Sequence, residues 1–181
     1  GCKTLENMIV YPHGSAARRS GTQFVAEVKD SSAKTRLIPF EFSTTQTYMM
    51  EFGNQYIRFY KDNGQILESD VTISGATQAN PVVITATGHG YSNGDEISIT
   101  GVVGMTELNN KRYLVANKTT NTFEITNVDG TNINGTGFTA YTSGGVANRV
   151  YEISTPYLTA ELFDIKFAQS ADVMYITHLN H

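Results

Sequence analysis

Hydrophobic and polar residues alternate with a period of two over much of the chain before residue 71. In residues 22–29, Phe24, Ala26 and Val28 fall on one face, with polar side chains mostly on the other. This alternation predicts a half-buried β-strand. No window of a dozen residues in this part carries a good 3.6-residue period, so we expect a sheet there.

The segments that follow predict a meander of antiparallel strands. Residues 35–42 are rich in apolar side chains, but Pro39 lacks a backbone N–H, which favours an edge strand or a bulge. Within residues 47–67, the Gly-Asn pair at 53–54 is typical of a hairpin turn. The sequence Asp-Asn-Gly at 62–64 tolerates positive φ and predicts a second turn.

Residues 71–148 are predicted to form a second all-β unit. Short runs rich in threonine are separated there by glycine and asparagine, which is typical of a small barrel or sandwich. The runs that predict strands are residues 81–88, 95–101, Tyr113–Ala116, Thr122–Thr126 and 137–145.

The last segment carries a different period. Leu158, Leu162 and Ile165 keep the spacing i, i+4, i+7, which predicts a short helix capped by Thr159. A final strand is predicted over residues 172–178.

The density of charge divides the chain in three. Of residues 1–70, 16 are charged, whereas only 8 of residues 71–148 are charged. The middle stretch contains 14 Thr, 10 Asn and 11 Gly instead, and residues 149–181 return to the composition of the first part. We therefore expect a mainly β protein. A discontinuous β-sheet domain with one short helix, residues 1–70 plus 149–181, is interrupted by a small inserted β-barrel at 71–148.

Composition and charge argue against several classes of protein. Hydrophobic residues make up 40% of the chain and charged residues 17%, which is enough for a core. The net charge of −4 argues against a nucleic-acid partner, because such binders usually show a basic surplus. No apolar run approaches the length of a membrane span. Cys2 is the only cysteine, so no internal disulfide can form, and the start without methionine leads us to expect a fragment.

His89 is the histidine that most invites a catalytic interpretation, because it lies between Gly88 and Gly90. A general base needs an orienting partner and a nucleophile or substrate within reach. No Ser/His/Asp set lies nearby in the sequence, and the two glycines suit a bend with positive φ. We therefore interpret His89 as part of a turn, and we predict no catalytic residue.

No metal or cofactor site is predicted. His178 and His181 are spaced i, i+3, but they follow a strand-like run and have no carboxylate or cysteine companion in the sequence, so a frayed terminus is expected. Residues 127–137 are rich in oxygen donors but lack the closing glutamate of a calcium loop, and a surface hairpin loop is expected. No phosphate-binding loop or dinucleotide fingerprint is present.

Two long stretches resemble large bacteriophage tail proteins. Residues 2–30 carry the pattern N-x-hydrophobic-V-x-P-x-G followed by RR-x-GT-x-FV, and residues 36–66 carry LIPFEFS and an EFG-x-x-Y-x-RFY meander. Residues 151–178 resemble the next block of the same proteins. Ser20 stands where the family usually has proline. Such tail proteins continue beyond this point, and they are similar in part to the nozzle proteins of short-tailed phages, which form a ring at the tail tip.

The middle stretch resembles a second, mobile unit. Residues 88–125 are similar to a small β-barrel of phage structural proteins and to the barrel in the first catalytic-cysteine half-domain of ubiquitin-activating enzymes. The resemblance places His89 in the turn between the first two strands and Phe123 in the core. No catalytic cysteine carries over, because Cys2 lies outside this unit.

These resemblances imply a non-enzymatic structural protein of a phage or prophage tail. It would be made in the bacterial cytoplasm and located in the virion. Its expected partners are other tail subunits, with a homo-oligomeric ring in the full-length protein. Arg18 and Arg19 form a basic loop that suits contact with phosphate or with an acidic partner surface.

Two other interpretations stay open. A module that recognises host-surface carbohydrate needs exposed aromatic side chains, for which Tyr91, Tyr113 and Tyr141 are the candidates, although tryptophan is absent. A tail-borne hydrolase needs a convergent pair of carboxylates in a cleft. Its candidate carboxylates are Glu51, Asp62 and Glu68.

Overall fold

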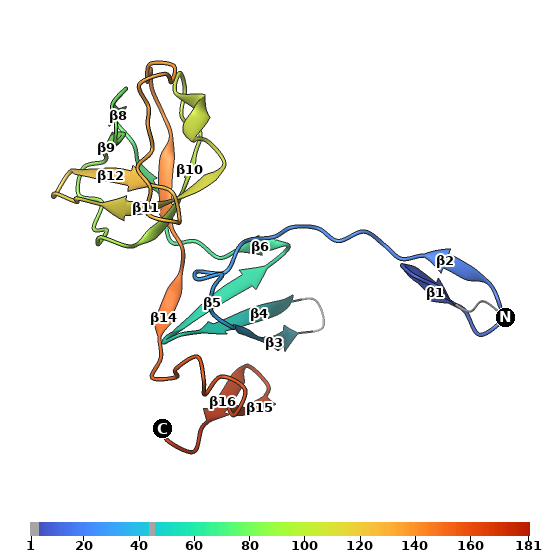
Figure 1. The fold of residues 1–181 in the computed structure, drawn as a ribbon. Coiled ribbons are helices and arrows are strands. Elements are labelled where there is room, and N and C mark those ends of the chain that lie inside the picture. Colours follow the sequence, from blue (N-terminus) through green and yellow to red (C-terminus); the bar gives the residue numbers. More distant parts are fainter. Residues whose placement is uncertain (1–3, 44–45) are drawn as a thin grey trace.

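The structure is a computed structural model that describes residues 4–43 and 46–181, so Cys2 lies outside it. Its strands form two larger sheets and two separate hairpins (Figure 1). The one helical element among the described residues is a 3-10 turn, η1 (Thr106–Leu108). The chain is therefore mainly β, as predicted. No helix in the described part is long and apolar enough to cross a membrane.

The first larger sheet, called the host sheet, is antiparallel and combines strands from before and after the middle stretch. In spatial order its strands are β14 (Glu152–Ser154), β5 (Tyr56–Lys61), β4 (Gln46–Gly53) and β3 (Arg36–Ser43), with β6 (Gly64–Gln65) also pairing with β5. Pro39 lies on the edge strand β3, as its missing N–H predicts. Asp62 and Asn63 have φ of 52° and 61°, which confirms the predicted turn between β5 and β6.

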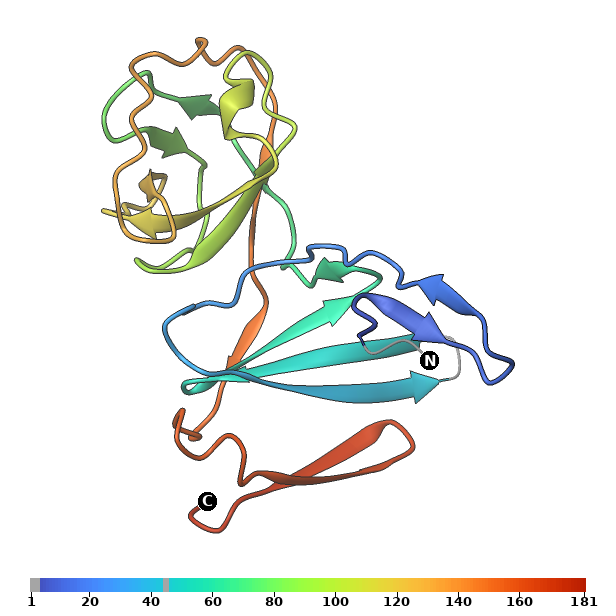
Figure 2. The same cartoon turned by 45° about the vertical axis from the view of Figure 1, so that its right-hand side comes forward.

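One face of the host sheet packs against the segment that follows β14. This segment contains a hairpin of β15 (Lys166–Ser170) and β16 (Val173–Thr177), which lies beneath the sheet in Figure 2. The strand predicted over 172–178 is thus confirmed, whereas β15 was not predicted. The buried cluster between the layers consists of Ile38, Met50, Phe52, Ile57, Tyr157, Leu162 and Ile165.

The short helix predicted around Thr159 does not form. Two consecutive turns occupy its place, closed by hydrogen bonds from Glu161 N to Leu158 O and from Asp164 N to Glu161 O. Leu162 and Ile165 are still buried, but Arg36 donates to both of their carbonyl oxygens, at 2.9 and 2.8 Å. These carbonyls therefore find their partner in a side chain of β3 instead of in a helix.

The second larger sheet, called the insert, has seven strands and curls on itself. Their order is β7 (Val71–Thr72), β13 (Val146–Arg149), β10 (Glu96–Thr100), β11 (Lys111–Ala116), β12 (Thr122–Thr126), β9 (Val83–Thr85) and β8 (Gly75–Ala76). The end strands β7 and β8 are joined by only two residues, so the curled sheet returns to its starting point. Its interior side chains include Ile84, Ile97, Ile99, Phe123 and Ile125, each 0% exposed.

The strand predicted over residues 137–145 is absent. Only Ser143 forms an isolated bridge there, with Val103. The half-buried side chains of Phe138 and Tyr141 instead pack against the core of the insert. The apolar residues in this stretch therefore cover the core from a loop.

The chain passes between the host sheet and the insert twice, and the two crossings pair with each other. Leu67 and Val150 form an antiparallel bridge. Glu68 N donates to Arg149 O at 2.8 Å, and Tyr151 N donates to Ile66 O at 3.0 Å. The insert is thus attached through a short two-stranded ribbon.

Residues 4–30 form an extended arm that carries a small hairpin of β1 (Met8–Val10) and β2 (Ala16–Arg18). Figure 1 shows this hairpin standing away from both larger sheets. The strand predicted over 22–29 is wrong, since these residues are not paired and Phe24 is 80% exposed. The alternation survives only in Ala26 and Val28, which are half-buried.

Candidate functional site

A row of side chains crosses the open face of the host sheet, opposite its buried cluster. The strand registers place Leu37 beside Glu51, Glu51 beside Arg58 and Arg58 beside Glu152. Directly opposed residues on neighbouring strands have their side chains in contact range. The row therefore alternates an acid, a base and an acid, with an apolar residue at the edge strand.

Arg58 ties this row to the insert. Its side chain is 1% exposed, and its Nη1 donates to Glu96 Oε2 on β10 at 2.8 Å, while its Nε donates to Glu152 Oε2 at 3.1 Å. Burial lowers the pKa of the guanidinium, but Glu96 and then Glu152 raise it, and the net shift is upward. Arg58 is thus charged and paired on both sides of the junction. Lys29 of the arm adds a second cation to Glu152, at 2.6 Å.

A second ion-pair group lies at the ribbon between the two units. Arg149 contacts Glu68 Oε2 at 2.8 Å and Asp95 Oδ2 at 2.9 Å, and its side chain is 34% exposed. The hydrogen bond to Glu68 is the largest cause of a raised pKa for Arg149. Together with Arg58 these residues line a polar crevice of about 360 Å³ at the junction. The charged side chains that line the crevice are paired with one another, which suits a fixed contact between the two units.

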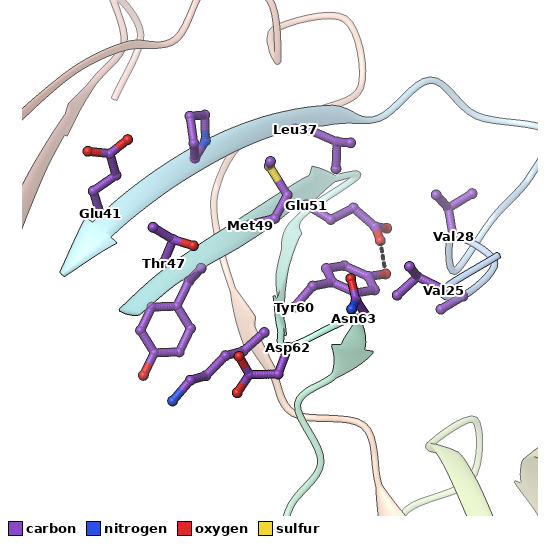
Figure 3. Close-up of a pocket in the computed structure, with 14 residues that line it drawn as sticks. Val25, Val28, Leu37, Glu41, Thr47, Met49, Glu51, Tyr60, Asp62 and Asn63 are labelled. Atoms are coloured by element: carbon purple, nitrogen blue, oxygen red, sulfur yellow. Dashed lines mark hydrogen bonds between the residues drawn. The ribbon is translucent and has the colours of Figure 1, made fainter. Parts of the chain in front are cut away.

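A mostly apolar cleft of about 510 Å³ lies on the open face of the host sheet, between the arm and strands β3 to β5 (Figure 3). Val25 and Val28 of the arm line one side, and Leu37 and Met49 line the sheet side. Leu37 is 58% exposed and Met49 is 37% exposed. The arm thus covers this apolar surface only in part.

Glu51 lies at one end of the cleft and is 1% exposed. Its Oε1 accepts the Tyr56 hydroxyl at 2.6 Å, and its Oε2 accepts the Tyr60 hydroxyl, as Figure 3 shows for Tyr60. Gly53 makes this possible, because a Cβ at that position would lie 2.1 Å from the Tyr56 ring. Burial, followed by the Glu51 contact, raises the pKa of both tyrosines.

Glu51, Asp62 and Glu68, the candidate catalytic carboxylates of a hydrolase, do not converge in one site. Glu51 and Asp62 both line the cleft, but Figure 3 shows that their carboxylates do not point toward each other. Both oxygens of Glu51 are already held by tyrosine hydroxyls. Glu68 lies at the ribbon, paired with Arg149.

The tyrosines predicted to contact a ligand pack in or against the core of the insert. Tyr91 is 3% exposed and donates to Ala147 O at 2.8 Å, and Tyr113 is 2% exposed and donates to Leu108 O at 3.2 Å. Tyr141 is half-buried, and its hydroxyl donates to the Ile73 and Gly144 carbonyls, both at 3.0 Å. The exposure expected of Tyr91 and Tyr113 is therefore not observed, because both side chains are buried in the core of the insert.

His89 lies in the turn between β9 and β10 and is 5% exposed. Its Nδ1 accepts the Tyr91 N–H at 3.0 Å, so its Nε2 is the donor to Thr119 O, also at 3.0 Å. The ring packs against Tyr91 and Phe123, with centroid distances of 5.1 and 5.0 Å. Gly88 has a φ of +63°, as the turn interpretation predicts. Both ring nitrogens are therefore used in holding the turn.

A sequence comparison covers most of the insert. Residues 79–151 match the family model of the ubiquitin-activating enzyme E1 FCCH domain. The match runs from just before β9 to just after β13, and we call this part the FCCH-like unit. It contains no cysteine, since the only one in the chain is Cys2. No curated protein shows significant similarity to the chain.

The FCCH-like unit also contains the oxygen-rich loop at 127–137. Asp129 Oδ1 accepts from both the backbone N and the hydroxyl of Thr131, at 2.8 and 2.7 Å, and Asn127 N donates to Thr131 O. These bonds lower the pKa of Asp129. The oxygens therefore close a turn, in line with the predicted surface loop.

Two predicted features lie outside the FCCH-like unit. Arg18 and Arg19 are exposed on the arm and stay available for contacts. His178 and His181, expected without a carboxylate companion, lie beside Glu161. Sequence reasoning missed Glu161 because it belongs to the turn that replaces the predicted helix. Hydrogen bonds from Leu158 N and Asn180, with a smaller effect of His181, lower the pKa of Glu161 to about 2.

Proposed function

We propose that this chain is a structural component of a bacteriophage tail that acts by subunit assembly through its N-terminal arm. The arm is the observation that carries the proposal: of residues 4–30, only Ala17, Ala26 and Val28 are even half-buried. The resemblance of residues 2–30 and 36–66 to tail proteins supports the tail context. The proposal includes no catalysis, because the buried carboxylate of the cleft is held by two tyrosines.

The arm exposes apolar side chains, which we expect a binding partner to bury. A two-stranded hairpin is marginally stable by itself in water, and exposed apolar clusters mark sites of protein contact. The large apolar side chains of the arm that are exposed by more than a third are Leu5, Met8, Ile9, Val10, Tyr11, Phe24 and Val25.

A second copy of the chain is the partner that charge and surface favour. The hairpin carries Arg18 and Arg19, whereas the whole chain has a net charge of −4. Beside the cleft, β3 lies at the edge of the host sheet, and an edge strand is a place where a further strand can be added. An arm that docks on the next subunit in this way repeats head to tail, and such contacts close into rings or extend as filaments.

Light scattering coupled to size exclusion tests the arm contact. We expect the wild-type chain to associate with increasing concentration, and Val10→Asp, at a side chain that is 63% exposed, to stay monomeric. Val128→Asp is the matched control, because Val128 is 48% exposed on the insert. A wild-type chain that is monomeric at every concentration contradicts the arm contact, as does a Val10→Asp variant that assembles normally.

The tail context has its own test. Virions that carry the gene can be labelled with antibody against the chain and viewed by electron microscopy. Label at the tail supports the proposal, and label confined to the capsid contradicts it.

A further inference from the structure

The residues after β16 fold back onto the turn that follows β14, and three metal-binding side chains meet there. Glu161, His178 and His181 each offer one ligand atom, and these atoms all lie within 4.8 Å of one another. Glu161 Oε2 and His181 Nε2 are 3.3 Å apart. A turn closed by His181 N and His178 O brings the two imidazoles to a centroid distance of 5.5 Å.

We propose that Glu161, His178 and His181 bind one zinc ion. Two imidazoles and a carboxylate are a ligand set that zinc uses, with the fourth position left to water. Zinc bonds of this type place neighbouring ligand atoms about 3.4 Å apart in a tetrahedron. The atoms therefore need to close by up to roughly 1.4 Å. Side-chain rotation supplies this movement, because the side chains of His181 and Glu161 are 29% and 18% exposed.

The surroundings of the three residues already orient them. Leu158 N and Asn180 Nδ2 donate to the Glu161 carboxylate at 2.9 and 3.1 Å. The Tyr157 ring packs edge-on against both imidazoles, with centroid distances of 6.0 Å to His178 and 5.5 Å to His181. Outer partners of this kind hold metal ligands in place and raise affinity.

One existing contact has to change when the ion binds. His178 Nδ1 accepts the Asn180 N–H at 3.2 Å, which leaves the proton of a neutral ring on Nε2. A ligating imidazole gives one bare nitrogen to the metal and carries its proton on the other. Zinc at either nitrogen of His178 therefore displaces the Asn180 N–H, and this backbone amide becomes a reporter of binding.

The ion would hold the end of the described chain against the host core. His178 and His181 lie beyond the β15–β16 hairpin, whereas Glu161 and its neighbour Tyr157 belong to the segment that packs under the host sheet. A metal that joins the two segments stabilises the folded state by mass action. This proposal is independent of subunit assembly, since none of its residues lies on the arm.

Zinc titration by calorimetry, with the chain in its apo form, tests the proposal. We expect one zinc per chain, reversal by a chelator and no binding of magnesium, which prefers oxygen ligands. Glu161→Gln, His178→Asn and His181→Asn should each weaken zinc binding at least about tenfold, as loss of even an outer partner does. His13→Asn on the arm is the matched control and should bind as the wild type does.

Two further readouts separate binding from folding. Zinc should shift the amide resonance of Asn180 and raise the melting temperature of the wild type. It should not raise the melting temperature of His181→Asn, and the circular dichroism spectrum of this variant without zinc shows whether it is folded. Absence of saturable binding to the wild type overturns the proposal. Unchanged zinc affinity in all three ligand variants overturns it as well.

Discussion

Arg58 is the residue through which the host sheet and the insert are most directly coupled. Its guanidinium is almost fully buried between one carboxylate from each unit. Removing one member of a buried ion pair leaves a charge without its partner, which costs about 3 to 5 kcal/mol. We expect Arg58→Met to lower the free energy of unfolding by about 3 kcal/mol in urea denaturation, because Glu152 is one-third exposed and regains some hydration.

Lys29 provides the control for Arg58, because it contacts the same Glu152 from the exposed arm. Its side chain is 38% exposed, so the pair is weakened by solvent. Lys29→Met should change the free energy of unfolding by less than about 1 kcal/mol. If Lys29→Met and Arg58→Met lower the free energy of unfolding equally, burial does not determine the strength of these ion pairs.

Glu51 makes a prediction about alkaline pH. The pKa of Tyr56 and Tyr60 is raised by burial and then by Glu51, so folding favours the protonated phenols. This stabilisation is complete below the ordinary tyrosine pKa of about 10 and is lost as the pH rises above it. Ultraviolet titration of Glu51→Gln should show both tyrosines ionising at lower pH than in the wild type. Glu41→Gln, at an exposed carboxylate of the same cleft, should leave the titration unchanged.

The environment of single residues is the feature that the sequence predicts least well. The turn at His89 could be predicted, because Gly88 and Gly90 mark the bend. The burial of Tyr91 and Tyr113 could not, because a tyrosine with its hydroxyl bonded to a backbone carbonyl suits a core as well as a surface. Glu161 was missed since its partners lie 17 and 20 residues away in the sequence.

At the scale of elements, the connection before η1 depends on one backbone position. Gly104 has a φ of +88°, and a Cβ there would lie 2.2 Å from Ala140 O. The free-energy cost of a left-handed alanine and the cost of the steric clash with Ala140 O are additive. Gly104→Ala should therefore destabilise the insert by about 3 kcal/mol. Thermal unfolding followed by circular dichroism measures this loss.

Gly88 is the matched control for Gly104. It has a φ of +63° but nothing within 4 Å of an added Cβ. Gly88→Ala should therefore cost only the conformational part, about 1 kcal/mol. If the two variants unfold at the same temperature, the steric clash at Gly104 does not contribute to the loss of stability.

Elements whose turns are specified by residue type were predicted well, as at Asp62 and Asn63. Two elements predicted from apolar spacing, the helix near Thr159 and the strand over 22–29, do not form. Leu162 and Ile165 are buried as their spacing requires, yet Arg36 supplies the bonds that a helix would have made. Phe24 alternates with its neighbours, but it has no neighbouring strand to pair with.

At the scale of the whole molecule, the two hydrophobic clusters share no residue. The cluster of the insert is drawn entirely from residues between 71 and 147. We therefore expect residues 70–151 alone to unfold in one cooperative thermal transition. Phe123→Ala in this piece should lower its free energy of unfolding by about 3 to 5 kcal/mol, because Phe123 is fully buried. A piece that is unfolded at room temperature would contradict this expectation.

The shift in charge density was the most informative signal at this scale. The drop near residue 71 and the return near residue 149 fall where the chain crosses between the two clusters. The ion pairs that fix the junction could not be foreseen, because Arg58 and Glu96 are 38 residues apart and belong to different sheets.

The paired crossings also determine how the molecule responds to load. A single connecting strand would let the insert rotate freely relative to the host sheet. The two crossing strands, bonded to each other at Leu67 and Val150, restrict this rotation. Tension on the insert reaches the host sheet through β13 and β14, which follow each other with only Val150 and Tyr151 between them. A pull along the axis of β14 loads the β14–β5 ladder in shear, because the hydrogen bonds of an antiparallel pair run perpendicular to the strands.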